Sequence, residues 1–226
     1  MELLSDPIHD TPILPGATIA GGLRHYLTQR TVGYRKKDED ADSIMKILFG
    51  EALDEDKGNQ SRLIIHDAYT ESGRRSTRDG VAINSKTRTA KDGKLFKLDV
   101  WEAGAKFDVC IELVLHDGDD IKAYKQAFAT LLKALQDGEI PMGARKNRGY
   151  GQCVVDSWAI YEYDLRTITG FLGWVNNDLS HATPQFIEGH ASYIDNRQRV
   201  VLSATFELCD SLMIRQYPPP KDDPNA

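Results

Sequence analysis

A glycine-rich basic stretch, GARKNRGYGQ at 143–152, contains the residues whose types and spacing most directly suggest chemistry. It places Arg145, Lys146 and Arg148 among three glycines, in a protein whose formal net charge is −6. Glycines let a ligand approach the backbone closely, and cations neutralise the charge of phosphate groups. The stretch therefore indicates either a cradle for phosphates or a solvated turn that happens to be basic.

A second basic region, residues 70–104, has the pattern of a long hairpin. Asp-Gly pairs at 79–80 and 92–93 are turn signals, and the alternation of apolar and polar residues over 94–101 is typical of a strand. A projecting basic hairpin with apolar residues near its tip suits a nucleic-acid strand, and an ordinary meander with a charged outer face is the alternative. Its basic residues are Arg74, Arg75, Arg78, Lys86, Arg88, Lys91, Lys94 and Lys97.

The elements that must position these two regions alternate between helix and strand. Apolar residues at helical spacing predict three helices, and apolar runs between turn signals predict three further strands. This order predicts an α+β fold of the ferredoxin-like (RRM-like) kind, with the basic hairpin and the glycine-rich loop as its distinguishing parts. The expected helices are 15–30, 42–53 and 119–138, and the expected strands are 61–69, 106–117 and 152–165.

The start of the first helix is a third candidate for anion binding. Gly16, Ala17 and Thr18 leave the first amide groups uncrowded, and the N-terminus of a helix attracts negative charge. We expect Gly16 and Thr18 to offer these amides to a phosphate, with the side chain of Arg24 nearby on the same helix.

Composition excludes several classes of protein. The 226 residues are 41% hydrophobic and 27% charged, which is typical of a soluble globular protein, and no membrane span or signal peptide is present. Cys110, Cys153 and Cys209 lie far apart, which argues against a zinc site or a disulfide framework and favours a reducing cytoplasm. The sequence also contains no Walker motif, no dinucleotide fingerprint and no nucleophile elbow. His25, His66 and His116 have no metal-ligand spacing, so we expect no metal site at them.

Three stretches together resemble the RAMP superfamily of CRISPR-associated proteins. PILPGATIAGGLRHYL (12–27) is similar to its helix-opening motif, and RDGVAINSKTRTAKDGKLFKLDVWEAGAKFDVCIEL (78–113) is similar to its long central motif. GARKNRGYGQC (143–153) is similar to its signature loop, G-x-x-[KR]-x-R-G-[YF]-G. Three motifs in the right order are far more specific than any one of them. The central motif points to the type III branch.

The resemblance implies binding of a guide (CRISPR) RNA together with complementary target RNA and other effector subunits. In this interpretation the glycine loop, the start of the first helix and the basic hairpin contact the RNA, and the hairpin separates or kinks the guide–target duplex. The expected RNA-binding residues are Gly16, Thr18, Arg24, Arg74, Arg75, Arg78, Lys86, Arg88, Gly143, Arg145, Lys146, Arg148 and Gly149.

The resemblance also implies a metal-assisted ribonuclease, in which an aspartate of the first loop helps the 2′-OH attack its adjacent phosphate. The loop here is SDPIHD (5–10), which makes Asp6 the first candidate and Asp10 the second, with His9 able to transfer a proton by its residue type. Mg²⁺ or Mn²⁺ would be the cofactor. Ser5 stands where strict spacing would put the aspartate, so Asp6, His9 and Asp10 are alternatively ordinary loop residues of a non-catalytic scaffold. A stand-alone guide-processing endonuclease is the third reading.

The domain organisation is expected to be a RAMP domain over 1–165, a linker over 166–198, and a strand and loop over 199–226 that resemble the start of a second repeat. Family members begin with a strand ahead of the first helix, and here a loop precedes it. A strand-like stretch, QRVVLSATFELCDSLMIR (198–215), instead follows the linker. We expect either a piece of a multi-repeat protein, or a strand that completes the sheet of this domain or of a neighbour.

Overall fold

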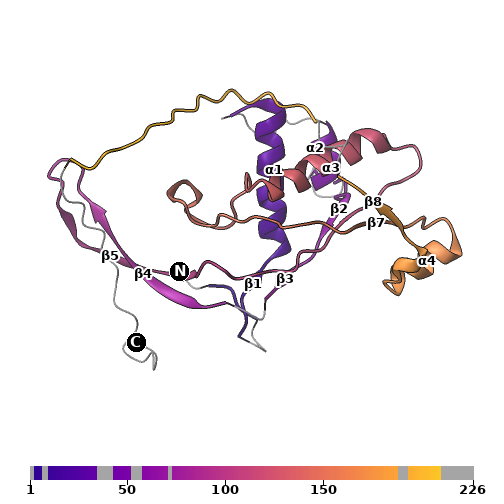
Figure 1. Cartoon of the computed structure of the whole chain (residues 1–226), viewed down its shortest axis with the longest axis horizontal. Helices are drawn as coiled ribbons and strands as arrows, with labels where there is room; N and C mark the ends of the chain where they lie inside the picture. The colour runs from indigo at the N-terminus through magenta and orange to yellow at the C-terminus, as the bar shows by residue number, and fades with distance from the viewer. Residues whose placement is uncertain are drawn as a thin grey trace.

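Helices α1 (Gly16–Val32) and α3 (Ile121–Gln136) cross at the centre of the protein, and the short α2 (Ser43–Phe49) packs against both (Figure 1). The computed structural model describes residues 3–6, 10–34, 43–51, 58–70, 73–187 and 193–209. Both long helices are confirmed close to their expected ends. Asp120 caps α3 by accepting a hydrogen bond from the Ala123 amide at 3.1 Å, and Gly138 follows its end with φ 70°. The largest fully buried side chains of the described chain are Ile19, Leu23, Leu27, Met45, Leu48, Leu131 and Ile140.

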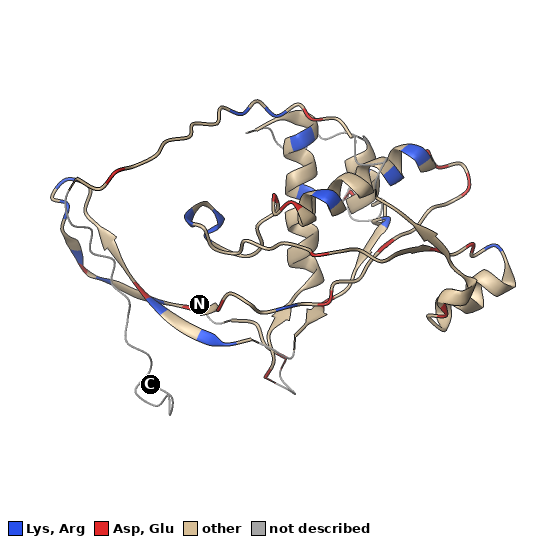
Figure 2. Ribbon diagram, in the orientation of Figure 1, with Lys and Arg blue, Asp and Glu red and all other residues tan. Residues whose placement is uncertain are grey.

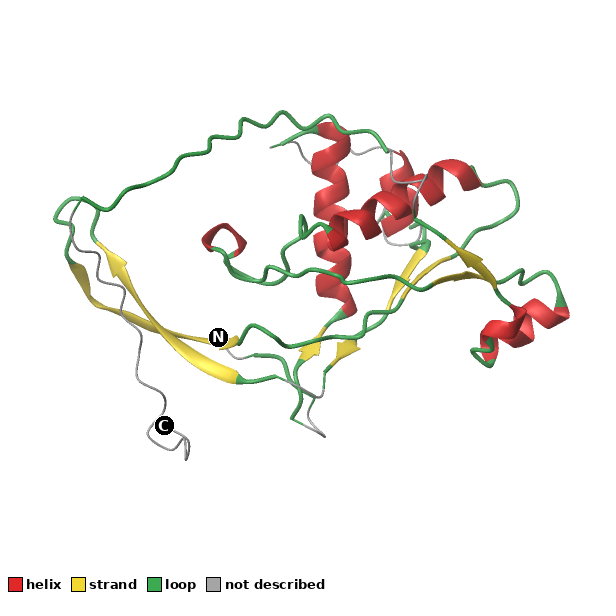
Figure 3. Ribbon diagram, viewed as in Figure 1, coloured by secondary structure: helices red, strands yellow, loops and turns green. Residues whose placement is uncertain are grey.

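Strands pair two by two, all antiparallel, so the described chain is a mixed α+β arrangement (Figure 3). The expected strand at 61–69 is in fact two strands, because the backbone changes partner at His66 and Asp67. The His66 amide donates to the Cys110 carbonyl at 3.2 Å. The following strand, Ala68–Tyr69, instead pairs with Ile13–Leu14, directly before α1. The pairs are β1 (Ile13–Leu14) with β3 (Ala68–Tyr69), β2 (Leu63–Ile65) with β6 (Ile111–Leu113), β4 (Arg75–Ile83) with β5 (Ala90–Trp101), and β7 (Ile160–Glu162) with β8 (Thr183–Gln185).

The long strands expected at 106–117 and 152–165 shorten to β6 and β7. The reason at 152–159 is that this stretch bonds to a helix rather than to a strand. The Val155 amide donates to the Leu135 carbonyl at 3.2 Å, and the Trp158 indole donates to the Leu132 carbonyl at 3.1 Å. An extended segment that satisfies its polar groups against the end of α3 forms no ladder.

The reversal between β4 and β5 lies at 84–89, not at the Asp-Gly pairs that signalled turns. Gly80 instead lies opposite Phe96, whose ring occupies the space of a side chain at Gly80. Asp92 and Gly93 fall where the register shifts between Val81 and Ile83, so the second pair forms an irregularity within β5. Asp-Gly pairs favour left-handed backbone, which occurs in bulges as well as in turns. The pairs therefore signalled turns where the hairpin does not reverse.

Two glycines of α1 serve close packing. A methyl group on Gly16 would overlap the Ile65 carbonyl oxygen, and one on Gly22 would lie 3.1 Å from the Met142 sulfur. Gly22 therefore lets residues 140–142, which lead into the glycine loop, lie directly against α1. The helix thus positions both the β2–β3 connection and the loop.

We expect Gly16→Ala to destabilise the protein by roughly 1–3 kcal/mol, because backbone atoms must move to admit the methyl group. Gly21→Ala is the matched control, since nothing lies within 4 Å of its added methyl group. The control should stabilise the helix by about 0.5–1 kcal/mol. Urea unfolding monitored by circular dichroism measures both changes, and equal stabilities for the two variants would contradict this packing.

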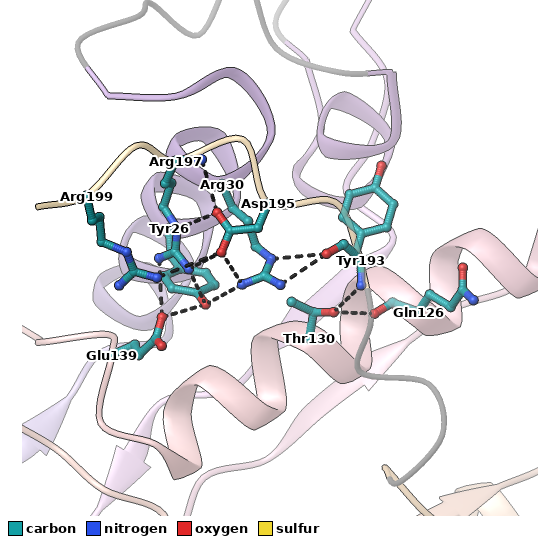
Figure 4. Close-up of polar contacts among 9 residues, drawn as sticks. All are labelled: Tyr26, Arg30, Gln126, Thr130, Glu139, Tyr193, Asp195, Arg197 and Arg199. Carbon is teal, nitrogen blue, oxygen red and sulfur yellow. Dashed lines mark hydrogen bonds and ion pairs between the residues drawn. The ribbon is translucent and has the colours of Figure 1, made fainter.

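Residues 193–197, which we name the latch, bind to α1 and α3 (Figure 4). The Asn196 amide donates to the Arg30 carbonyl at 2.7 Å, and the Tyr193 amide donates to the Thr130 hydroxyl at 3.2 Å. Arg197 has only 4% of its side chain exposed. It pairs with Asp195 at 2.7 Å and Glu139 at 3.2 Å, and its guanidinium lies 4.7 Å from the centre of the Tyr26 ring. The hydrogen bond from Arg197 holds the pKa of Asp195 well below its usual range.

Beyond the latch, residues 200–208 run extended away from the helices (Figure 1). Val200 and Phe206 are each 89% exposed, and Leu202 is 91% exposed. This run pairs with no strand within the ranges that the structure describes. The helices of those ranges are also too short or too polar to cross a membrane.

Candidate nucleic-acid interface

The glycine loop, residues 143–151, is closed at its base by a hydrogen bond from the Met142 amide to the Gly151 carbonyl at 2.8 Å. Its backbone is left-handed at Gly143, Arg145, Gly149 and Gly151, with φ of 78°, 58°, 81° and 73°. A methyl group on Gly151 would overlap the Met142 carbonyl oxygen, whereas Gly143 and Gly149 face open space. Gly151 therefore permits closure, and the other two leave bare backbone at the surface. Right- and left-handed residues in succession form the concave amide surfaces that bind anions.

The three cations of the glycine loop lie on a single 3₁₀ turn, η2 (Lys146–Arg148), and the residue that begins it. The Arg148 amide donates to the Arg145 carbonyl at 2.8 Å, which fixes the turn. Among the residues that the structure describes, none of Arg145, Lys146 and Arg148 forms an ion pair. Their positive charge is therefore available to an anionic ligand.

Arg145 connects the glycine loop to the hairpin formed by β4 and β5. Its guanidinium lies 4.6 Å from the centre of the Phe96 ring, within the range of a cation–π interaction. Phe96 lies opposite Gly80, and the next pair on this face of the hairpin is Arg78 with Leu98. Because alternate residues share a face, Arg78 lies on the side of the hairpin that Arg145 contacts. The structure thus brings two of the predicted RNA-binding arginines to one face.

Arg75 lies on the opposite face, where it pairs with Asp99 at 2.9 Å. Hydrogen bonds from Arg75 and Thr77 lower the pKa of Asp99. A carboxylate therefore already partners Arg75, while Arg74 lies exposed just before the strand.

The end of the hairpin contains lysine and arginine residues (Figure 2). It also has exposed apolar side chains. Lys86 and Arg88 lie in its connecting loop, where Arg88 has a left-handed φ of 57° and donates its amide to the Asn84 carbonyl at 2.8 Å. Ile83 and Leu95 are exposed nearby, Leu95 by 72%. Cations beside apolar groups match a single nucleic-acid strand, which offers phosphates and unstacked bases.

The start of α1 is arranged differently from the expectation. The Gly16 amide donates to the Asp67 carboxylate at 2.7 Å, and the Thr18 amide donates to the Pro15 carbonyl at 2.8 Å. In this structure, therefore, the protein's own acceptors receive both amide hydrogens. Arg24 is half-buried on α1.

The first loop holds the two acidic residues that were singled out. The Asp6 amide donates to the Thr11 carbonyl, and the Asp10 amide donates to the Asp6 carbonyl, both at 2.8 Å. Asp10 has a left-handed φ of 49°. Asp6 and Asp10 therefore share one closed loop, and His9 lies outside the described residues.

Strained backbone coincides with the residues singled out from the sequence. Within the described ranges, the non-glycine residues with left-handed backbone are Asp10, Arg88, Arg145 and Asn177, and the first three of these are candidate functional residues. Such conformations cost about 1–3 kcal/mol each and cluster at functional sites.

Phe96 is the contact that sequence reasoning missed. It stands between Lys94 and Lys97 in a strand whose predicted alternation depended on Leu95, Leu98 and Val100. A lone aromatic among cations is the signal that could have indicated it.

A model of the RAMP superfamily matches residues 3–154, which include the first loop, α1, the hairpin and the glycine loop. A comparison with curated proteins gave no match.

Proposed function

Because the chain belongs to the RAMP superfamily, we propose that it binds guide RNA as a backbone subunit of a type III CRISPR effector complex. The family implies a CRISPR-associated, RNA-binding function. We also propose that the helices and strands form the ferredoxin-like arrangement. The single observation that carries the proposed RNA binding is the cationic glycine loop, without ion pairs among the described residues, that contacts the hairpin through Arg145 and Phe96.

The RNA is proposed to run along the basic side chains of the glycine loop and then along the hairpin. Arg145, Lys146 and Arg148 bind consecutive phosphates, and the bare backbone at Gly143 and Gly149 lets the strand approach closely. Arg78 extends this positive surface onto the hairpin. At its end, Lys86 and Arg88 hold phosphates while Ile83 and Leu95 contact bases, which kinks the duplex of guide and target.

The first loop is the proposed site of target cleavage. Asp6 accepts the proton of a target 2′-OH, the 2′ oxygen bonds to the adjacent phosphorus, and the bond from phosphorus to the 5′ oxygen breaks. The products are a cyclic 2′,3′-phosphate and a 5′-OH end, and His9 supplies the proton to the leaving oxygen. Asp6 and Asp10 lie on the same loop, and their carboxylates are the type of ligand that Mg²⁺ and Mn²⁺ prefer. The bound cation would neutralise charge that develops on the phosphate.

Other subunits are proposed to contact the stretch beyond the latch. Residues 200–208 are extended, exposed and rich in apolar side chains. A strand with these properties gains backbone partners and buried area when it pairs with a sheet of a further RAMP unit. This supports the alternative in which residues 200–208 complete the sheet of a neighbouring RAMP unit.

The test of RNA binding uses the purified chain and a labelled single-stranded RNA, measured by fluorescence anisotropy across a salt series. We expect log affinity to fall linearly with log salt, with a slope of about −0.7 for each phosphate contacted. A blunt duplex of the same sequence should bind more weakly, because its bases are stacked away from the hairpin. Absence of salt-dependent binding, or equal affinity for the duplex, would overturn the proposal.

A further inference from the structure

Three side chains that could bind a metal meet on the outer face of the β2–β6 pair. The ligand atoms of His66, Cys110 and Glu112 all lie within 4.8 Å of one another. Ile65 pairs with Ile111, so His66 lies directly across from Cys110, and Glu112 follows two residues later on the same face. The alternate residues of both strands point inward and pack in the core. The register in which β2 pairs with β6 therefore brings the three side chains together.

The separations of the ligand atoms are close to those of a metal site. His66 Nε2 lies 2.8 Å from Glu112 Oε1. In a zinc site with bonds of about 2.0–2.3 Å, the ligand atoms lie about 3.3–3.8 Å apart. Side-chain shifts of about 1 Å therefore convert the present arrangement into a coordinating one. The exposed position leaves the fourth place to water.

Trp174 of α4 (Ile168–Val175) gives the cluster an outer support. Its indole Nε1–H donates to Glu112 Oε2 at 2.9 Å, so one carboxylate oxygen is oriented and the other faces His66. Hydrogen bonds of this kind orient the ligands of metal sites. They also connect the cluster to α4, a separate element of the chain.

We propose that His66, Cys110 and Glu112 bind one zinc ion that joins β2 to β6. An imidazole, a thiolate and a carboxylate form the mixed nitrogen, sulfur and oxygen set that zinc accepts, whereas magnesium and calcium require oxygen ligands. Binding displaces the Cys110 thiol proton to solvent, so the sulfur coordinates as thiolate. Trp174 is a positioning residue that acts through Glu112. The site is separate from the RNA surface proposed above.

The test titrates zinc into the intact chain after removal of metal by a chelator, using isothermal calorimetry and elemental analysis. We expect one zinc per chain. Cys110→Ser or Glu112→Gln should lower the zinc affinity by more than about 100-fold, because loss of a ligand costs more than loss of a residue that only hydrogen-bonds to a ligand. Cys209→Ser is the matched control, an exposed cysteine outside the cluster. Trp174→Phe should lower the affinity by about 10-fold.

Cobalt provides an independent readout. The cobalt-loaded chain should show thiolate-to-metal charge-transfer absorption that the Cys110→Ser variant lacks and the Cys209→Ser variant retains. Circular dichroism of the metal-free variants should match the wild type, because all three positions are on the outer face. Zinc binding that survives both Cys110→Ser and Glu112→Gln, or no binding at micromolar zinc, overturns the proposal whatever the result for RNA.

Discussion

Replacing both Arg145 and Arg148 with alanine is expected to weaken binding of single-stranded RNA by at least about 100-fold, since hydrogen bonds to charged groups contribute about 1.5–3 kcal/mol each. The salt slope should become shallower by about 1.4, which corresponds to the loss of two phosphate contacts on a single strand. Both effects follow because no described carboxylate neutralises these side chains. The measurement is fluorescence anisotropy across a salt series.

The charge-matched control for this variant is Lys122→Ala with Lys133→Ala, which removes two cations from α3. Lys133 pairs with Asp137 at 2.7 Å, and both lysines are exposed. This control should change the affinity for single-stranded RNA by less than about 3-fold, because salt screens charges that lie far from the bound strand. Equal losses in the two double variants would show that net charge, not the glycine loop, governs binding.

Asp6→Ala is expected to reduce divalent-metal-dependent cleavage of target RNA by about 10²–10⁴-fold, the usual contribution of a positioned acid or base. RNA binding should be unchanged, because Asp6 lies on the first loop and outside the cationic glycine loop. Cleavage is measured as the appearance of cyclic-phosphate products from a labelled target paired with the guide.

The matched control for Asp6 is Asp156→Ala, an exposed carboxylate that follows the glycine loop. It should retain full cleavage. If the wild-type chain does not cut in Mg²⁺ or Mn²⁺, it is a scaffold repeat, and Ser5 at the expected aspartate position is the reason. Metal-free cutting of repeat hairpins that depends on a histidine would instead indicate a guide-processing endonuclease.

Local sequence determined α1 and α3 because their signals lie within a few residues of one another, whereas α4 lies in the stretch expected to be a linker. Leu131 and Leu135 recur at helical spacing, and Asp120 and Gly138 mark the ends of α3. The strands were less predictable, since a strand exists only where a partner pairs with it. Residues 152–159 have strand composition, yet they bond to α3 at Leu132 and Leu135.

The sequence by itself also indicated which residues carry the charge of the candidate site, because Arg145, Lys146 and Arg148 stand among glycines whatever the fold. Only the tertiary structure decided what these residues meet. The contact of Arg145 with Phe96 joins positions 49 residues apart, and no periodicity in the sequence encodes it.

The cluster of His66, Cys110 and Glu112 shows most clearly that the sequence alone does not reveal which side chains meet. The three residues have no metal-ligand spacing along the chain, and the scattered cysteines argued against a zinc site. Pairing of β2 with β6 in one particular register places the three side chains on one face. A shift of that register by one residue would turn one strand's ligands inward, so the arrangement belongs to the fold and not to the sequence pattern.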